Sequence, residues 1–230
     1  MNTKESVTSN GHPYQILLIE DHPVFRKGLK ALIEEEENLT VCGEADSIAT
    51  ALNQIKALNP DLAVVDIALK GRSGLDLIPE IKSLKPDLLV LVVSMFDETA
   101  YVQRALQAGA RGFIVKNEST ETVVDGIQAL LRGEIAVSEP HRTRILESQF
   151  SSPSNNPLDN PQAILTNREL EIFQLIGQGK ATREIADNLN LSIKTIGTYR
   201  ERLKDKLGLK HAAALAKHAV QYMEKQRFSR

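Results

Sequence analysis

The sequence has little cysteine, few aromatic residues and no long apolar run. One cysteine, Cys42, among 230 residues excludes an intramolecular disulfide and a cysteine-based zinc site, and we expect it to be a small buried hydrophobe on a strand. Aromatic residues make up 4% of the chain and Trp is absent, so the core must be mainly aliphatic. No apolar stretch approaches the roughly 20 residues that cross a bilayer, and the polar first fourteen residues lack the hydrophobic part of a signal peptide. We therefore expect a cytoplasmic protein, outside the membrane, with a mobile N-terminal tail.

The net charge of -2 conceals two regions of opposite sign. Residues 164–230 contain 13 of the 28 basic residues but only 7 of the 30 acidic ones. The C-terminal part is therefore basic and the remainder is acidic. A basic segment of this kind favours contact with nucleic acid.

Short apolar runs alternate with helical patterns over most of the chain. Five runs are typical of strands, at residues 14–20, 39–44, 61–66, 88–94 and 112–116. This alternation predicts an α/β domain with a doubly wound, five-stranded parallel sheet of the flavodoxin-like kind, followed by a small all-α domain. We assign residues 14–134 to the first domain, 135–163 to a linker rich in Pro, Ser and Asn, and 164–226 to the second domain.

Polar side chains stand where four of the predicted strands end. They are Glu20, Asp21, Asp66, Ser94 and Lys116. Ligands bind outside the carboxyl ends of the strands in such sheets, so we expect these groups to converge. Taken singly, each would more often be a helix cap or a solvated loop residue. Their joint occurrence at the correct strand ends favours a site.

The predicted cluster suits phosphoryl transfer. Carboxylates held together repel unless a cation lies among them, and Mg²⁺ prefers oxygen ligands. Phosphoryl transfer needs mainly positioning and charge neutralisation, and a carboxylate can accept the group as an aspartyl phosphate. We therefore interpret Asp66 as the nucleophile and Glu20 and Asp21 as Mg²⁺ ligands. Lys116 and Ser94 would contact the phosphoryl group.

The motifs EDHPVFRKGL, VVDIALKGRSGLDLI, VVSMF and AGARGFIVK resemble the receiver domain of bacterial two-component response regulators. The resemblance implies that a sensor histidine kinase phosphorylates Asp66 and that Asp66 itself and the backbone carbonyl of Ala68 also bind Mg²⁺. It makes Phe113 the aromatic switch residue. One departure is Lys70, which stands where the family often has a proline that stiffens the loop.

The basic segment has the signals of a helix-turn-helix. Thr166 and Glu169 form a capping-box pattern, Ser192 is placed to cap a third helix, and Gly208 closes that helix. The motifs LTNRE, GKATREIA and LSIKTIGTYRERLKDKLG resemble the DNA-binding domain of the LuxR/NarL/FixJ group. The residues we expect at DNA are Lys194, Thr195, Thr198, Tyr199, Arg200, Arg202 and Lys206. The resemblance also places Gly197 and Glu201 among the base readers, and leaves the final helix as either a dimerisation surface or part of the domain core.

The five histidines do not have the spacing of a metal site. His22 follows the acidic pair and is placed to border the site, but we favour its interpretation as a loop histidine.

Together these features predict a response regulator and not an enzyme, apart from its own Mg²⁺-dependent phosphotransfer and dephosphorylation. Phosphorylation would shift a two-state receiver, so that homodimers bind paired promoter half-sites. RNA polymerase is a further expected partner. Two alternatives remain: a phosphatase with an aspartyl nucleophile, or a constitutive DNA-binding protein with a vestigial receiver.

Overall fold

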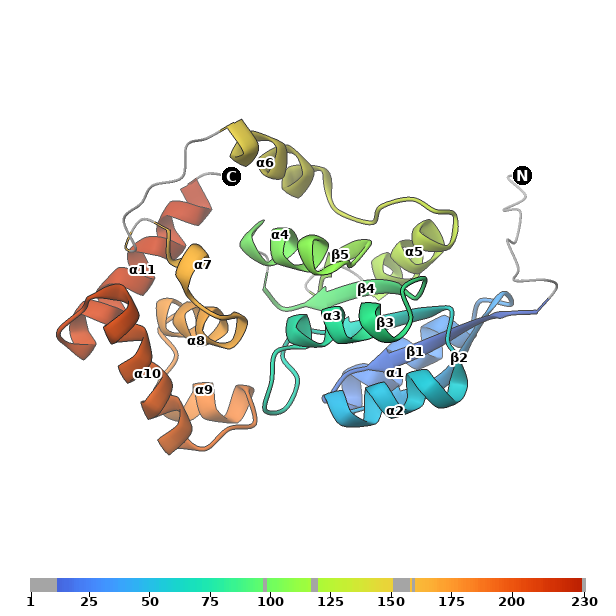
Figure 1. Ribbon diagram of the computed structural model, residues 1–230, viewed down its shortest axis with the longest axis horizontal. Coiled ribbons are helices and arrows are strands. Elements are labelled where there is room, and N and C mark those ends of the chain that lie inside the picture. The colour runs from blue at the N-terminus through green and yellow to red at the C-terminus, as the bar shows by residue number, and fades with distance from the viewer. Residues whose placement is uncertain (1–11, 97–98, 117–119, 151–157, 159, 229–230) are drawn as a thin grey trace. The chain divides into compact units, whose positions relative to one another are not determined.

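The computed structural model describes residues 12–96, 99–116, 120–150, 158 and 160–228. The chain forms two compact units, Met1–Arg142 and Thr143–Arg230, which are considered separately (Figure 1). The expected N-terminal tail lies almost entirely outside the described residues, as does part of the predicted linker. Among the helices described, none has the length and apolar character needed to cross a bilayer.

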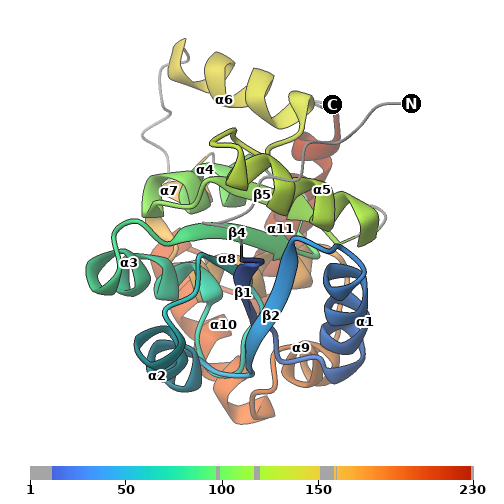
Figure 2. The same ribbon diagram turned by 90° about the vertical axis from the view of Figure 1, so that its right-hand side faces the viewer.

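The first unit is built on a parallel sheet with the strand order β2-β1-β3-β4-β5, which confirms the predicted fold class. The strands are β1 (Tyr14–Ile19), β2 (Leu39–Ala45), β3 (Leu62–Asp66), β4 (Leu89–Ser94) and β5 (Gly112–Val115). The helices are α1 (Pro23–Glu34), α2 (Ile48–Leu58), α3 (Gly74–Leu84), α4 (Thr99–Ala108) and α5 (Thr120–Leu131). Figure 2 shows α1 and α5 on one face and α2, α3 and α4 on the other.

Burial on both faces explains why the strands are continuous apolar runs. All five residues of β3 are buried, including Asp66 at its end. The register pairs Asp66 with Val93 and Ser94 with Val115, so the ends of β3, β4 and β5 lie side by side. The backbone amide of Lys116 donates to the Ser94 carbonyl at 2.7 Å. The register therefore brings three of the expected site residues to one edge.

The segment 135–163, which we assigned to the linker, has regular secondary structure in part of its length. It contains α6 (Glu139–Phe150), and Ala136 forms a parallel bridge with Gly112 of β5. Helix α6 lacks the apolar stripe by which a helix is predicted from sequence. Its Leu146, for example, is 58% exposed. Without an apolar face of helical period, α6 could not be recognised from the sequence.

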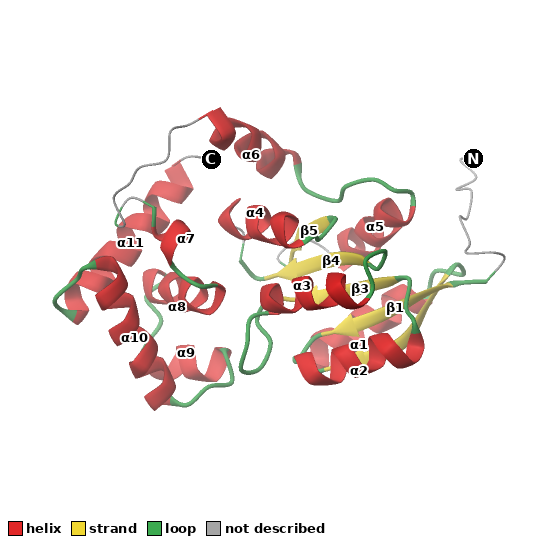
Figure 3. Cartoon of the chain, viewed as in Figure 1, coloured by secondary structure: helices red, strands yellow, loops and turns green. Residues whose placement is uncertain are grey.

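The described residues of the second unit form helices joined by loops and turns, with no strand among them (Figure 3). Besides most of α6, it contains α7 (Pro161–Ile164), α8 (Asn167–Gly177), α9 (Thr182–Asn188), α10 (Ile193–Leu207) and α11 (Ala212–Phe228). The capping box of Thr166 and Glu169 is present, the Ser192 hydroxyl accepts from the Thr195 amide, and Gly208 ends α10 with a φ of 66°. Helices α9 and α10 form the predicted helix-turn-helix.

Helix α11 contributes to the core of this unit. The ring centroid of Phe173 in α8 lies 5.7 Å from that of His218 and 5.6 Å from that of Tyr222, both in α11. Leu215 and Ala219 of the same helix are fully buried. Of the two roles left open for the final helix, core packing is therefore observed.

Candidate functional site

A buried cluster of charges occupies the carboxyl-terminal edge of the sheet. Lys116, which follows β5, places Nζ 2.6 Å from Glu20 Oε2 and 2.9 Å from Asp66 Oδ2. The three side chains are only 6%, 5% and 2% exposed, respectively. Residues at the carboxyl ends of β1, β3 and β5 thus meet, as the sequence predicts. One ammonium group bridges two carboxylates in a largely dry environment.

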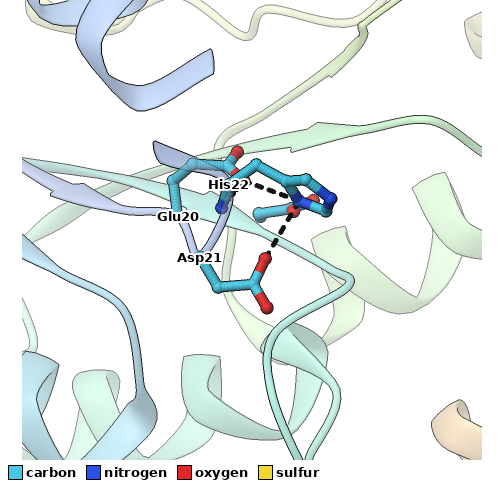
Figure 4. Close-up of side chains that lie close together, drawn as sticks. Glu20, Asp21 and His22 are labelled. Atoms are coloured by element: carbon cyan, nitrogen blue, oxygen red, sulfur yellow. Dashed lines mark hydrogen bonds and ion pairs between the residues drawn. The ribbon is translucent and has the colours of Figure 1, made fainter. Parts of the chain in front are cut away.

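His22 borders this cluster beside the acidic pair, which was the alternative to its interpretation as a loop histidine. Its Nδ1 lies 3.0 Å from Asp21 Oδ1 and 3.4 Å from Glu20 Oε1, and Figure 4 shows the imidazole turned toward both carboxylates. One potential ligand atom from each of Glu20, Asp21, His22 and Asp66 lies within 4.8 Å of the others. The sequence places His22 next to the acidic pair, but the direction of its ring depends on neighbouring side chains and could not be predicted.

Burial and mutual repulsion set the protonation of the cluster. Burial, followed by the charge of Asp66, raises the pKa of Glu20 above its ordinary value. Burial also raises the pKa of Asp21. For Lys116, burial opposes the charged form, but the charges of Asp66 and Glu20 outweigh it and raise the pKa of the ammonium. The cluster therefore favours additional positive charge.

The donor set fits a hard divalent cation. Three carboxylates, those of Glu20, Asp21 and Asp66, face one ammonium group, so two negative charges remain when all are ionised. Oxygen donors are the ligands that Mg²⁺ prefers, and a divalent ion would balance this excess. The carbonyl of Ala68, in the loop after β3, stays a predicted ligand.

The loop between Asp66 and α3 depends on glycine at one position. A Cβ atom on Gly74 would lie 1.8 Å from the backbone oxygen of Asp66, which no side chain allows. The Gly74 amide donates to the Ile67 carbonyl at 2.7 Å. Gly71 has a φ of 80°, which also favours glycine, but the space around it is open. Close packing of α3 against the strand end thus holds Asp66 in place.

The two expected switch residues are both buried. Ser94 is 0% exposed, and its Oγ accepts a hydrogen bond from the Phe96 amide at 3.0 Å. Phe113 is 3% exposed, and its ring centroid lies 6.5 Å from that of His141 at the start of α6. Their roles in switching stay predictions.

Two further residues of α1 support the cluster and were not found from the sequence. Lys116 Nζ lies 4.4 Å from the centroid of the Phe25 ring. The Arg26 guanidinium donates to the Glu20 carbonyl at 2.5 Å and pairs with Glu44 of β2 at 3.0 Å. Both residues lie in the first turn of α1, directly after the acidic pair, and this proximity is what the sequence shows of their role.

Helix α10 carries the residues expected at DNA. Those with exposed side chains are Lys194, Thr198, Arg202 and Lys206, whereas Thr195, Tyr199 and Arg200 are partly buried. The Arg202 guanidinium lies 5.8 Å from the Tyr199 ring centroid. Lys206 is engaged inside the unit, because its Nζ lies 2.6 Å from Glu169 Oε2 at the start of α8. Lys206 thus has a structural role that its sequence position did not show.

Glu201, expected among the base readers, presents a 68% exposed carboxylate that pairs with Lys204 at 2.7 Å. Gly197 has no atom within 4 Å of where a Cβ would stand, so the helix surface is open there.

Comparison with known proteins agrees with this geometry. Residues 16–128 match the response regulator receiver domain, and residues 163–219 match the bacterial regulatory proteins of the luxR family. The oxygen regulatory protein NreC of Staphylococcus aureus (strain JH9) is 32% identical over 210 residues, covering 90% of this chain and 96% of NreC.

Solved structures give the same result. A structure of the Salmonella typhimurium RcsB response regulator covers 92% of this chain and 98% of its own, with 25% identity and a TM-score of 0.62. A second structure is that of RcsB from Salmonella enterica serovar Typhimurium bound to promoter P1flhDC in the presence of phosphomimetic BeF3-. The match covers 90% of this chain and 98% of the RcsB chain, with 25% identity and a TM-score of 0.58.

The pairing of a receiver domain with a LuxR-type helix-turn-helix defines a transcription regulator and not an enzyme in the usual sense. The chain belongs to the two-component response regulators of the NarL/FixJ type.

Proposed function

We propose that Asp66 accepts a phosphoryl group from a sensor histidine kinase. The observation that carries the proposal is the placement of Asp66 Oδ2 at the sheet edge, 2.9 Å from Lys116 Nζ and beside Glu20 and Asp21. A carboxylate oxygen of Asp66 attacks phosphorus, the bond from phosphorus to the donor nitrogen breaks, and an aspartyl phosphate forms. The Lys116 ammonium is within reach of an oxygen of the incoming group.

The carboxylates of Glu20, Asp21 and Asp66, with the Ala68 carbonyl, would hold Mg²⁺. When bound, this ion supplies charge neutralisation for the transferring group. The charge excess of the cluster supports this assignment. Lys116 then exchanges part of its contact with the carboxylates for contact with the phosphoryl group, while Phe25 and the strand end keep the ammonium in place.

Phosphorylation would act on the rest of the receiver through Ser94 and Phe113. If the Ser94 hydroxyl turns toward the phosphoryl group, it gives up the hydrogen bond from the Phe96 amide. Phe113 then repacks, which changes its contact with His141 at the start of α6. The receiver thereby shifts between two states, and only the phosphorylated state favours dimerisation.

The output is regulated binding of promoter DNA by α10. RcsB, which is similar over most of its length, forms dimers on DNA in one of its structures. We propose the same arrangement here, with paired α10 helices reading half-sites about one helical turn apart. Contact with RNA polymerase would follow at the promoter.

The test is phosphorylation of the full chain by acetyl phosphate with Mg²⁺, beside Asp66→Asn. The expected result is a phosphoryl adduct in the intact mass of the wild type alone, together with dimer formation in size-exclusion chromatography. Tighter binding to a promoter fragment of the regulated genes should accompany the adduct. An adduct of equal yield on Asp66→Asn, or turnover of a phosphate ester, would overturn the proposal.

A further inference from the structure

We propose that His22 is a ligand at the metal site and enables it to bind a first-row transition ion, Mn²⁺, Co²⁺ or Ni²⁺, in addition to Mg²⁺. This inference rests on the proposed function, because it concerns the same carboxylates. It goes further by assigning a nitrogen donor to a site otherwise made of oxygen. Nitrogen donors change which divalent ions a site prefers.

Geometry places the imidazole at the cluster. Nδ1 of His22 faces both members of the acidic pair, at 3.0 Å from Asp21 Oδ1 and 3.4 Å from Glu20 Oε1 (Figure 4). A ligand atom of Asp66 lies within the same 4.8 Å group. Four side chains therefore bring one nitrogen and three oxygens within 4.8 Å of one another.

The position of His22 in the chain supplies an independent argument. His22 is the N-cap residue of α1, yet its side chain makes no capping hydrogen bond. Its backbone amide instead donates to Glu20 Oε1 at 3.0 Å, which fixes the residue beside the carboxylate. The ring contacts the acidic pair and does not supply the capping hydrogen bond that an N-cap side chain normally makes.

Exposure makes a ligand role practical. The His22 side chain is 57% exposed, whereas those of Glu20 and Asp21 are 5% and 0% exposed. The imidazole therefore stands at the solvent side of a buried carboxylate group. An ion entering from solvent meets the nitrogen first and then the oxygens. Mg²⁺ binds nitrogen poorly, so it would use the carboxylates and water at this position.

The proposal predicts a selective loss of affinity. Replacing His22 with Asn should weaken Ni²⁺ and Co²⁺ binding by about tenfold or more and Mg²⁺ binding by less than about twofold. Isothermal titration of the full chain with each metal alone gives these ratios. His211→Asn is the matched control, since it removes an exposed histidine from the second unit, and it should change neither affinity. His22→Gln provides a second variant, and circular dichroism confirms that both retain the fold.

Pulsed electron paramagnetic resonance of bound Mn²⁺ gives a direct readout. Wild-type protein should show the coupling of a ligand nitrogen to the ion, and His22→Asn should bind Mn²⁺ without that coupling. Mn²⁺ bound to the wild type without nitrogen coupling, or parallel losses for Mg²⁺ and Ni²⁺ in His22→Asn, would overturn the inference alone. Failure of the wild type to bind any divalent ion, with Asp66 unlabelled by acetyl phosphate, would overturn the proposed function as well.

Discussion

The ammonium of Lys116 lies 2.9 Å from the carboxylate of Asp66, so the proposed phosphoryl acceptor is paired with a buried cation. The same ammonium contacts Glu20 at 2.6 Å. Lys116 thus compensates two carboxylates that would otherwise repel each other.

Replacing Lys116 with Met should destabilise the receiver by about 3 kcal/mol without metal, because buried carboxylates lose their partner. Mg²⁺ should restore more stability to this variant than to the wild type, since the ion replaces the missing charge. Thermal unfolding with and without Mg²⁺ measures both effects. Lys27→Met, at an exposed position of α1, is the control and should behave like the wild type. An identical Mg²⁺ response in all three proteins would contradict this role for Lys116.

Replacing Gly74 with Ala should destabilise the receiver by about 3 kcal/mol, because the new Cβ meets the Asp66 carbonyl oxygen at 1.8 Å and the loop must move. Gly71→Ala provides a comparison in the same loop. Gly71 has a φ of 80°, but the space around it is open. The alanine should therefore add only about 1 kcal/mol of backbone strain. Urea unfolding of both variants measures which one loses more stability. Equal losses would show that the contact with Asp66 is not what requires glycine.

Replacing Gly197 with Ala should stabilise α10 by about 1 kcal/mol, since glycine is a poor helix former and no atom obstructs the Cβ. Promoter affinity should nevertheless fall by about tenfold, or 1.4 kcal/mol, if the open surface at Gly197 approaches the DNA. Gly28→Ala is a matched control, because Gly28 also lies in a helix with open space around it. It should stabilise the receiver and leave promoter affinity unchanged. Unchanged affinity in Gly197→Ala would remove this residue from the interface.

The start of α8 should depend on pH through Glu169. Burial opposes ionisation of Glu169, but the hydrogen bond from Lys206 and those of the capping box outweigh it and lower the pKa. A lowered folded-state pKa stabilises the fold above the ordinary value of about 4.3, and this stability is lost as pH falls through the folded-state value. Unfolding of the second unit, followed by the NMR signals of Tyr222, should therefore become easier below about pH 4.

Replacing Glu169 with Gln should lower the free energy of unfolding by about 1 kcal/mol at neutral pH. The loss is small because Lys206 is 39% exposed and solvent weakens its ion pair with Glu169. The acid-dependent loss should also become smaller in this variant. Glu184→Gln is the comparison, since Glu184 accepts from the Ala181 amide in a similar position but at an exposed site. It should have a smaller effect, and a loss as large as that of Glu169→Gln would assign the stability to capping alone.

Much of the fold and of the receiver site was predictable because both depend on local pattern. Apolar strands buried on both faces end at the sheet edge, and this places Asp66 and Lys116 together without knowledge of any side-chain direction. His22 and Lys206 were different. The orientation of the His22 ring depends on two neighbouring carboxylates, and Lys206 pairs with Glu169 across 37 positions of sequence. The helix at Glu139–Phe150 also escaped prediction, because it has no apolar stripe.

The bridge between Ala136 and Gly112 has a practical consequence for work with fragments. β5 is an edge strand, and Ala136 occupies its outer side through a hydrogen bond from the Phe113 amide at 2.7 Å and another to the Arg111 carbonyl at 3.2 Å. An open strand edge readily pairs with another chain and promotes aggregation. A receiver fragment ending at residue 134 would expose this edge, whereas one ending at Arg142 keeps it covered. Dimers measured with the shorter fragment would report pairing of exposed strands and not the regulated association of the full chain.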